Sequence, residues 1–235
     1  MYSFESRIRY SEVDKDGRLT LEELLDYFQD CSTFHSEDIG VGTSYLAGHN
    51  MVWVLSAWQI VVDRYPKLGE RVTIGTFPYD FKGFLGYRNF VMQDETGKQT
   101  ACANSVWTLL DLEKQLPTRP TPLMVEKYVL EDKLPMDYAA RKIAVPKNGE
   151  KREEIIVKKY HLDTNNHVNN GQYVRMAMDF LPDGFKVSQM RAEYKKQALL
   201  EDIIIPETSD NGNQYTVCLN DSQNNAFAVV EFTKL

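Results

Sequence analysis

The chain has 235 residues, of which 43% are hydrophobic and 26% are charged, and its formal net charge at pH 7 is −7. This charge argues against a general affinity for nucleic acid or for anionic membranes, because both would be repelled over a long range. The uncharged apolar runs are far too short to cross a bilayer, and the opening MYSFESRIRY lacks the apolar core of a secretory signal. We therefore expect a cytoplasmic protein without a membrane segment.

The three cysteines, Cys31, Cys102 and Cys218, are widely separated, odd in number and surrounded by apolar residues. Such cysteines are typical of small buried side chains and not of a disulfide framework or a metal site. We expect no metal and no other cofactor.

The first half of the chain begins with a short strand, a polar turn and a helix. Ser6–Tyr10 has strand character, and the turn VDKDGRLTLEELL starts at Val13. Thr20 and Glu23 form a capping box at the start of the helix. One face of the helix is apolar, with Leu21, Leu24, Leu25 and Phe28. Turn residues separate the strands that follow: Val52–Val62, Arg71–Phe77, Phe84–Met92 and Thr100–Asp111.

Residues Glu12–Glu23 also match a calcium-binding loop. Acidic side chains occupy the first, third, fifth and last positions of this loop, and Gly17 occupies the sixth. Against calcium binding, the first position is Glu rather than Asp, the preceding segment looks extended rather than helical, and no second such loop is present. Glu23 also has a simpler role in the capping box, so we favour a structural turn.

The second half repeats this plan more briefly. Ile155–Tyr160 has strand character, and the polar run DTNNHVNNGQY spans Asp163–Tyr173. Apolar residues then recur with helical spacing, at Tyr173, Met176, Ala177, Phe180 and Leu181. Pro182 with Gly184 ends this helix. The strand patterns that follow are Met190–Lys196, Ile203–Pro206, Tyr215–Leu219 and Ala226–Phe232.

Aligning the chain with itself shows one structural unit used twice. Val13–Leu25 and Leu162–Val174 align in register 149 positions apart, with Leu19 opposite Val168. One strand, one helix and then an antiparallel sheet predict an α+β fold in which each sheet wraps around its helix. The charged, proline-punctuated segment 125–149 connects the copies, so we expect domains over residues 1–124 and 150–235.

The polar run is the candidate site. In an extended segment alternate side chains share one face, so Asp163, Asn165, His167 and Asn169 would converge. The helix that follows would aim free N–H groups at this face, where they favour developing negative charge. The alternative is a polar turn without chemistry, in which Asn169 caps the helix and Gln172 takes the reciprocal position. Part of the run fits each interpretation.

Basic residues gather in the middle and the later part of the chain. They are Lys142, Lys147, Lys151, Arg152, Lys158, Lys159, Arg191, Lys195 and Lys196. Such a cluster predicts a cationic patch for an acidic partner. For any single lysine, a solvated surface is the simpler explanation.

Four stretches follow one another along nearly the full length of the chain. They are WVLSAWQIVVDRYPKLG from Trp53, ANSVWTL from Ala103, DTNNHVNNGQY from Asp163 and EYKKQALLED from Glu193. Together and in this order they resemble the acyl-acyl carrier protein (acyl-ACP) thioesterases of bacteria and plant plastids. The resemblance implies a tandem double hotdog fold, with the acyl pocket in the N-terminal half and the catalytic residues in the C-terminal half.

The resemblance also implies a reaction, in which the thioester between a fatty acyl chain and the phosphopantetheine arm of acyl carrier protein is hydrolysed and free fatty acid is released. The Asp-x-Asn-x-His pattern of the family falls on Asp163, Asn165 and His167. His167 suits proton transfer near neutral pH, and Asp163 would orient it or activate water itself. Asparagine amides and helix N–H groups would stabilise the oxyanion.

The chain departs from the family directly after EYKK. Plant members carry an acid and then a cysteine where this chain has Gln197 and Ala198. A cysteine nucleophile is absent from that position, so we expect direct hydrolysis by an activated water, which the Gln197 amide would position. The remaining candidates for substrate contact are Asn169, Asn170, Trp53 and Trp58.

Two other functions stay open. An acyl-coenzyme A thioesterase would use the same fold and nearly the same site, whereas the use of acyl carrier protein predicts a basic docking surface. A non-catalytic acyl-binding hotdog protein fits the loss of the family's acid at Gln197. Hotdog proteins commonly associate, so a homodimer is plausible for any of the three.

Overall fold

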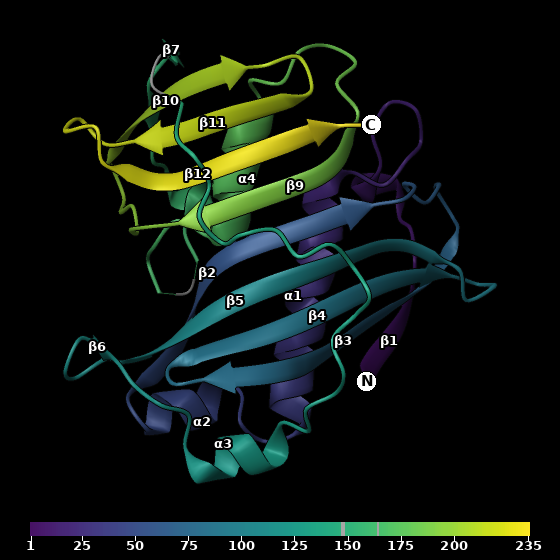
Figure 1. Cartoon of the computed structure of the whole chain (residues 1–235), viewed down its shortest axis with the longest axis vertical. Coiled ribbons are helices and arrows are strands. Elements are labelled where there is room, and N and C mark those ends of the chain that lie inside the picture. Colours follow the sequence, from purple (N-terminus) through teal and green to yellow (C-terminus); the bar gives the residue numbers. More distant parts are fainter. Residues whose placement is uncertain (147–148, 164) are drawn as a thin grey trace. The chain divides into compact units, whose positions relative to one another are not determined.

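The computed structural model of the chain describes residues 1–146, 149–163 and 165–235. By their internal contacts these residues divide into two compact units. Unit 1 comprises Met1–Ser56 and Ile60–Tyr138, and unit 2 comprises Ala57–Gln59 and Ala139–Leu235. Each unit combines a sheet with one longer helix (Figure 1).

The sheet of unit 1 has the strand order β1-β3-β4-β5-β2. Its strands are β1 (Tyr2–Arg7), β2 (Met51–Val62), β3 (Arg71–Lys82), β4 (Leu85–Asp94), β5 (Gln99–Asp111) and the short β6 (Leu116–Pro117), which pairs with β5. The pairs β1–β3, β3–β4 and β4–β5 are antiparallel. The helices are α1 (Leu21–Asp38), α2 (Thr43–Gly48) and α3 (Pro122–Lys127).

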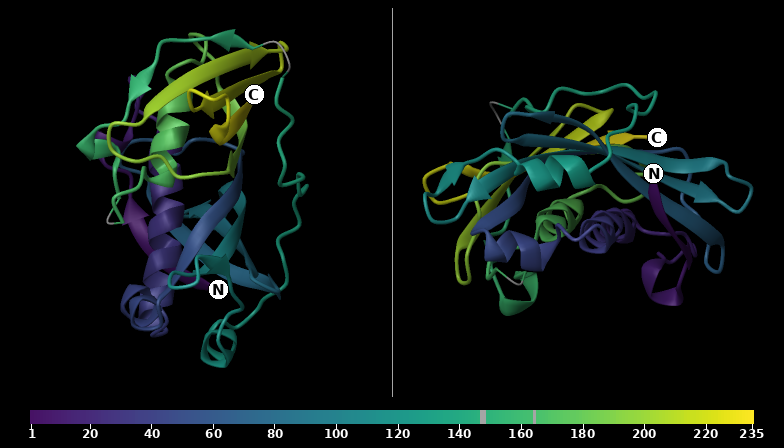
Figure 2. Two further views of the ribbon diagram at one scale, coloured as in Figure 1. Left: turned by 90° about the vertical axis from the view of Figure 1, so that its left-hand side faces the viewer. Right: turned by 90° about the horizontal axis from the view of Figure 1, so that it is seen from below.

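Helix α1 lies along one face of this sheet (Figure 2). The hydroxyl of Thr20 accepts a hydrogen bond from the backbone N–H of Glu23, so the predicted N-cap is confirmed. The predicted apolar face is buried, with Leu21, Leu24, Leu25 and Phe28 each at most 2% exposed. The ring of Phe28 contacts that of Phe90 on β4, with 5.3 Å between their centroids. The sheet and α1 therefore share one hydrophobic core.

Unit 2 has the strand order β9-β12-β11-β10-β7. Its elements are β7 (Glu150–Lys151), β8 (Ile155–Ile156), α4 (Asn170–Met178), β9 (Val187–Tyr194), β10 (Ile203–Asp210), β11 (Gln214–Asn220) and β12 (Ala226–Lys234). All of its strand pairs are antiparallel, including the pairing of β8 with β10. Tyr173, Val174 and Ala177 of α4 are buried.

Several predicted boundaries are wrong, each for a physical reason. Strand β3 continues past Phe77 to Lys82, because the register shifts just after Pro78 and such a bulge accommodates a proline. Helix α4 ends at Met178, before Phe180 and Leu181. The N–H groups of these two residues bond to carbonyls three positions earlier, so the last turn tightens before it ends.

The two strands predicted before the polar turns are also shorter than expected. Strand β1 ends at Arg7, and β8 contains only Ile155–Ile156. In each copy a short 3-10 helix follows, over Tyr10–Glu12 in the first and Lys159–His161 in the second. The chain therefore turns toward the polar loop earlier than the apolar pattern indicates.

Polar side chains anchor the segment between the copies to each sheet. In unit 1 the carboxamide oxygen of Asn89 accepts hydrogen bonds from the Leu134 N–H (3.1 Å) and the Tyr138 hydroxyl (2.9 Å). In unit 2 the Glu193 carboxylate accepts one from the Ile143 N–H (3.0 Å). These bonds satisfy the backbone of a connection that forms little secondary structure of its own.

Unit 1 should lose stability in acid through His35. Burial and the charge of Arg88 lower the pKa of His35 to about 4, and its Nδ1 lies 2.9 Å from an Arg88 guanidinium nitrogen. The unfolded chain binds this proton near pH 6.5, so stability is lost as the pH falls through that value toward the folded pKa. We expect wild type to lose about 2 kcal/mol more than His35→Gln between about pH 7.5 and about pH 5, measured by urea unfolding. Equal losses in the two proteins would contradict this assignment.

Candidate active site

The polar run forms a tight turn in unit 2. One carboxylate oxygen of Asp163, Oδ1, accepts hydrogen bonds from the backbone N–H groups of Asn165 (2.8 Å) and His167 (3.2 Å). The N–H of Asp163 donates in return to the carbonyl of His167 (2.8 Å). Asn166 adopts a left-handed backbone conformation with φ of 60°. These features close the chain back on itself between Leu162 and Val168, which form a bridge.

The prediction of an extended segment with a shared face is therefore wrong. The Asp163 carboxylate captures backbone donors that a strand would offer to a neighbour, and Asn166 tolerates the left-handed conformation that the turn requires. Asn165 is exposed, whereas Asp163 and His167 are half-buried. The three side chains do not line one face of a strand, and their roles in the reaction remain predictions.

The start of α4 follows this turn directly. The side chain of Asn169 accepts a hydrogen bond from the Gly171 N–H (2.8 Å) and its carbonyl accepts one from the Gln172 N–H (2.9 Å). The predicted cap is confirmed. The N–H of Asn169 donates to the His161 carbonyl (2.9 Å), so Gln172 is not needed as its reciprocal partner. Two of the first three N–H groups of α4 are used by the cap, and they are not free for an oxyanion.

The imidazole of His167 has a buried Nδ1 atom without a hydrogen-bond partner among the described residues. Buried polar atoms of this kind are rare, and each calls for an explanation such as a catalytic role. A buried N–H without an acceptor is rarer than a buried acceptor without a donor. The neutral ring is therefore assigned its proton on Nε2, which makes Nε2 a hydrogen-bond donor.

The same turn is present in unit 1, so the predicted duplication is confirmed at the level of single hydrogen bonds. Oδ1 of Asp14 accepts from the N–H groups of Asp16 (2.9 Å) and Arg18 (3.0 Å). Gly17, at the position of Asn166, has φ of 69°. The aspartate thus builds the turn in both copies, whereas only the second copy carries an imidazole. Strand β1 and the single 3-10 turn Tyr10–Glu12 precede this turn, where a calcium-binding loop needs an α-helix.

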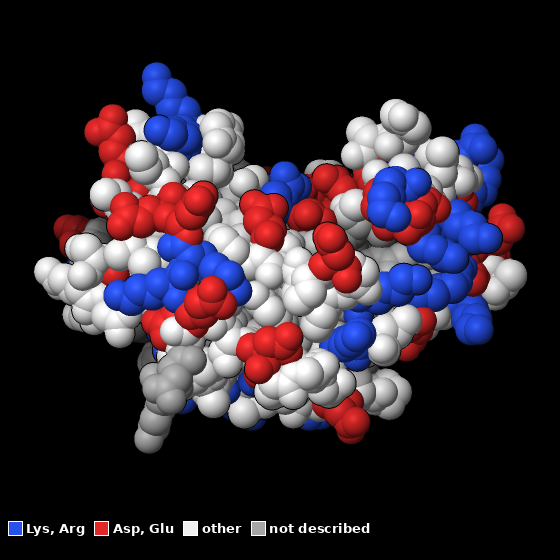
Figure 3. All heavy atoms as spheres, turned by 90° about the horizontal axis from the view of Figure 1, so that it is seen from above, with Lys and Arg blue, Asp and Glu red and all other residues white. Residues whose placement is uncertain are grey.

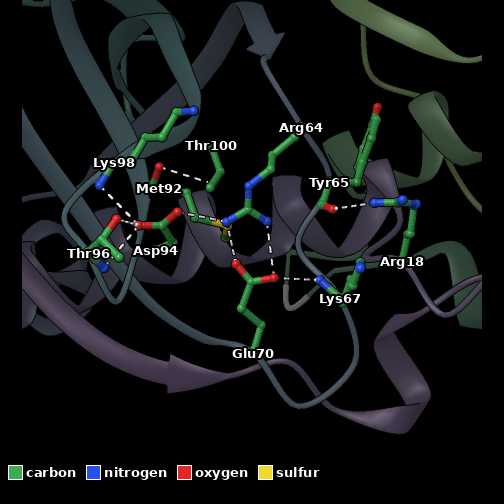
Figure 4. A network of polar contacts seen from close by, with 10 residues as sticks. All are labelled: Arg18, Arg64, Tyr65, Lys67, Glu70, Met92, Asp94, Thr96, Lys98 and Thr100. Carbon is green, nitrogen blue, oxygen red and sulfur yellow. Dashed lines mark hydrogen bonds and ion pairs between the residues drawn. The ribbon is translucent and has the colours of Figure 1, made fainter.

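A network of polar contacts holds the loop that lies beside the first turn (Figure 4). A guanidinium nitrogen of Arg18 donates to the Tyr65 carbonyl (3.3 Å). Arg64 is paired with Glu70 at 2.5 Å and with Asp94 at 2.8 Å. The exposed fraction of the Arg64 side chain is 38%, so the network acts mainly by fixing the loop and less by adding stability.

Unit 2 has a similar ion pair directly before Gln197 and Ala198, the two residues that depart from the family pattern. Lys196 pairs with Asp221 at 2.5 Å, as Arg64 does with Asp94. Gln197 is exposed and Ala198 is buried. The Ala198 carbonyl accepts a hydrogen bond from the Val168 N–H (3.0 Å). The loop that carries Gln197 is thereby joined to the turn that carries His167.

The other predicted contact residues lie in different surroundings. Asn170 begins α4, and its carbonyl accepts a hydrogen bond from the Tyr194 hydroxyl (3.0 Å). Trp53 on β2 is half-buried and stacks on Phe81 with 6.2 Å between ring centroids. Trp58 is buried, with 2% of its surface exposed. The proposed contacts of Asn170, Trp53 and Trp58 with the substrate remain predictions.

The predicted basic cluster is interleaved with acids. Carboxylates lie close to several of its members, in the pairs Arg152–Glu150, Arg191–Glu231, Lys195–Glu193 and Lys196–Asp221. The face shown in Figure 3 carries both acidic and basic side chains, with basic ones gathered toward its right-hand edge and acidic ones across its centre. Lys147 lies outside the described residues. The cluster is therefore less cationic than its sequence indicates.

No helix among the described residues is long and apolar enough to cross a membrane. Within the same residues, no group of three or more His, Cys, Asp or Glu side chains is placed to hold a metal ion.

An antiparallel sheet packed against one helix, with a polar turn at the start of that helix, defines a hotdog fold, and this chain contains it twice. The chain belongs to the acyl-ACP thioesterase family. The model of the acyl-ACP thioesterase N-terminal domain matches residues 1–128, and that of the C-terminal domain matches residues 145–234.

Known relatives agree with this assignment. An acyl-[acyl-carrier-protein] hydrolase of Cuphea viscosissima, a chloroplastic protein, is 25% identical over 88% of this chain and 54% of its own length. The chain thus spans about half the length of the curated relatives it matches.

Solved structures show the same fold. An acyl-ACP thioesterase from Bacteroides thetaiotaomicron has a TM-score of 0.90 at 22% identity, over 98% of this chain and 96% of that one. The 12:0-ACP thioesterase from Umbellularia californica has a TM-score of 0.86 at 18% identity, over 99% and 96%.

Proposed function

We propose that this chain hydrolyses fatty acyl-ACP to free fatty acid and the thiol form of the carrier, as a step of fatty acid biosynthesis. The observation that supports this most is the match to both domains of the family in their order, because it covers the half that carries the candidate site. The names of the relatives point to the same substrate class. Nδ1 of His167, which has no hydrogen-bond partner in the part of the chain that the structure describes, adds a feature that the packing of a purely structural turn leaves unexplained.

In the reaction we propose, a water attacks the thioester carbonyl carbon. The oxygen of that carbonyl becomes an oxyanion, the carbon–sulfur bond then breaks, and the thiolate takes up a proton. Oδ1 of Asp163 is committed to the turn, and the second carboxylate oxygen accepts the proton of the water. Nε2–H of His167 donates a hydrogen bond to the oxyanion or the departing sulfur, and the proton that Asp163 has taken from the water passes to the thiolate. The amides of Asn165 and Gln197 assist by positioning the water and the carbonyl.

Other properties of the active protein follow from the same proposal. We place it in the cytoplasm, as a homodimer, and with a preference for acyl carrier protein over coenzyme A. Because acidic side chains lie among the basic ones, we expect the basic cluster to orient the carrier protein during docking more than to attract it strongly.

Incubation with acyl-ACPs of several chain lengths tests whether the chain is an enzyme. We expect repeated release of the carrier thiol, detected by a thiol reagent, with many turnovers per protein molecule. Binding of acyl-ACP without any thiol release would refute hydrolysis and establish the non-catalytic alternative.

A further inference from the structure

Two tyrosines, Tyr173 and Tyr194, distinguish unit 2 from unit 1 near the candidate site. Tyr173 on α4 stands 149 positions after Leu24 of α1, in the register of the duplicated turn. Both side chains are buried, at 2% and 1% exposure. The second copy thus places a phenol where the first has an aliphatic side chain.

The partner of the Tyr173 hydroxyl explains this difference. The N–H of Ala198 donates to the hydroxyl oxygen at 2.8 Å. In unit 1 the residue that corresponds to Ala198 is Pro66, because the Pro66 carbonyl accepts from the Leu19 N–H (2.8 Å) as the Ala198 carbonyl does from Val168. Proline has no N–H, so unit 1 needs no acceptor there. In unit 2 the buried N–H needs one, and Tyr173 supplies it.

The matching loops confirm this correspondence. Four backbone hydrogen bonds of residues 66–70 recur at the equivalent positions of residues 198–202. In each loop the backbone N–H of the second residue also donates a hydrogen bond to the carboxylate of the fifth. The Lys67 N–H donates to Glu70 (2.9 Å), and the Leu199 N–H donates to Asp202 (2.8 Å). Ala198 and Pro66 therefore occupy equivalent places in the fold.

Tyr194 on β9 completes the arrangement. In the register of the two loops, in which Ala198 stands 132 positions after Pro66, Tyr194 corresponds to Val62 at the end of β2. Its hydroxyl donates to the carbonyl of Asn170, the first residue of α4, and its ring lies 6.0 Å from that of Tyr173. The two hydroxyls thus connect α4, β9 and the loop at Ala198, and the Ala198 carbonyl holds Val168 next to His167.

We propose that Tyr173 is a positioning residue for His167, acting through Ala198 and Val168. This inference rests on the proposed function for its effect on rate. The hydroxyl fixes the loop against the helix, and the loop fixes the turn that presents the imidazole. A displacement of about 1 Å in a reacting group costs on the order of 100-fold in rate, so a lost loop anchor has a large effect without touching substrate. Burial raises the pKa of Tyr173 to about 12, so the hydroxyl stays neutral over the working range of pH.

The test compares Tyr173→Phe, which keeps the ring and removes only the hydroxyl, with Tyr27→Phe in unit 1. Tyr27 is also buried, and its hydroxyl donates to Glu12 at 2.9 Å. We expect Tyr173→Phe to lower kcat about 10- to 100-fold with little change in KM, because the imidazole is misplaced and binding is retained. Tyr27→Phe should lose a similar amount of stability and keep its kcat.

A second substitution separates positioning from a general loss of stability. Tyr173→Phe with Ala198→Pro recreates the arrangement of unit 1, in which no N–H needs an acceptor, so kcat should recover. Ala198→Pro alone should lower kcat, because the proline ring would press on the hydroxyl. A Tyr173→Phe variant with wild-type kcat, or a double variant slower than Tyr173→Phe, would overturn the proposal.

The ring resonances of His167 provide a readout that does not need activity. We expect them to shift in the NMR spectrum of Tyr173→Phe and to stay in place in that of Tyr27→Phe. If wild type releases no thiol while these shifts occur, the proposed function is wrong and the positioning contact stands. If wild type is active and the His167 resonances of Tyr173→Phe are unchanged, the positioning proposal is wrong and the function stands.

Discussion

Replacing His167 by Ala is expected to lower kcat for acyl-ACP hydrolysis about 100- to 10,000-fold, the range typical of a lost proton donor or acceptor. The imidazole carries the buried Nδ1 atom that has no partner among the described residues, so its removal breaks no hydrogen bond of the fold at that atom. We therefore expect normal expression and a melting temperature close to that of wild type. Initial rates of thiol release measure the effect.

The duplicated turn offers a matched control for this experiment. Arg18 stands at the position of His167 in unit 1, and its guanidinium donates to the Tyr65 carbonyl, so Arg18→Ala should retain a rate within about twofold of wild type. Equal losses in the two variants would show that the turns matter for folding alone. A fully active His167→Ala variant would show that the imidazole takes no part in the reaction.

Replacing Asp163 by Asn is expected to abolish turnover while the turn survives. The carbonyl oxygen of Asn can accept the same two backbone hydrogen bonds that Oδ1 of Asp163 accepts now. The substitution removes the negative charge, and with it the proton acceptor of the proposed reaction. Steady-state rates and urea unfolding, measured on one preparation, separate the two consequences.

Further variants assign the two roles of the aspartate. Asp163→Ala leaves two N–H groups without their acceptor and should cost about 1–3 kcal/mol of stability as well as activity. Asp14→Asn and Asp14→Ala repeat both changes in unit 1, where the turn is the same and no imidazole is present. They should reproduce the stability effects and leave the rate unchanged. Retained activity in Asp163→Asn would show that the Asp163 carboxylate has only a structural role.

The fold was predictable from sequence because its signals are local or repeated. The apolar spacing of Leu21, Leu24, Leu25 and Phe28 identified α1, and the antiparallel strands follow the alternation between turn residues. The ends of elements were harder to predict. Pro78 indicates the end of a strand in sequence, and only the pairing partner reveals that the strand bulges and continues to Lys82.

The candidate site was predictable in composition but not in shape. Alternating polar residues have the period of a strand, and the sequence offered no direct sign that Asp163 would bond to its own backbone. One available signal was the alignment of Asn166 with Gly17, since glycine and asparagine are the residues that tolerate a left-handed turn.

The positioning contact of Tyr173 lay beyond sequence reasoning. Its partner is a backbone N–H at Ala198, 25 residues further along the chain. The helical spacing marks Tyr173 as a core residue and says nothing about its hydroxyl. The relevant difference is that unit 1 has Pro66 where unit 2 has Ala198. This correspondence becomes visible only when the two loops are matched by their hydrogen bonds.

The most direct test of the account is a comparison of kcat/KM for one acyl chain carried in turn by acyl carrier protein and by coenzyme A. Free thiol is measured for both substrates with the same enzyme preparation. We expect multiple turnovers on both esters or on the carrier-protein ester alone, with the higher kcat/KM for the carrier protein. A higher kcat/KM for the coenzyme A ester, or no thiol release from either ester, would contradict it.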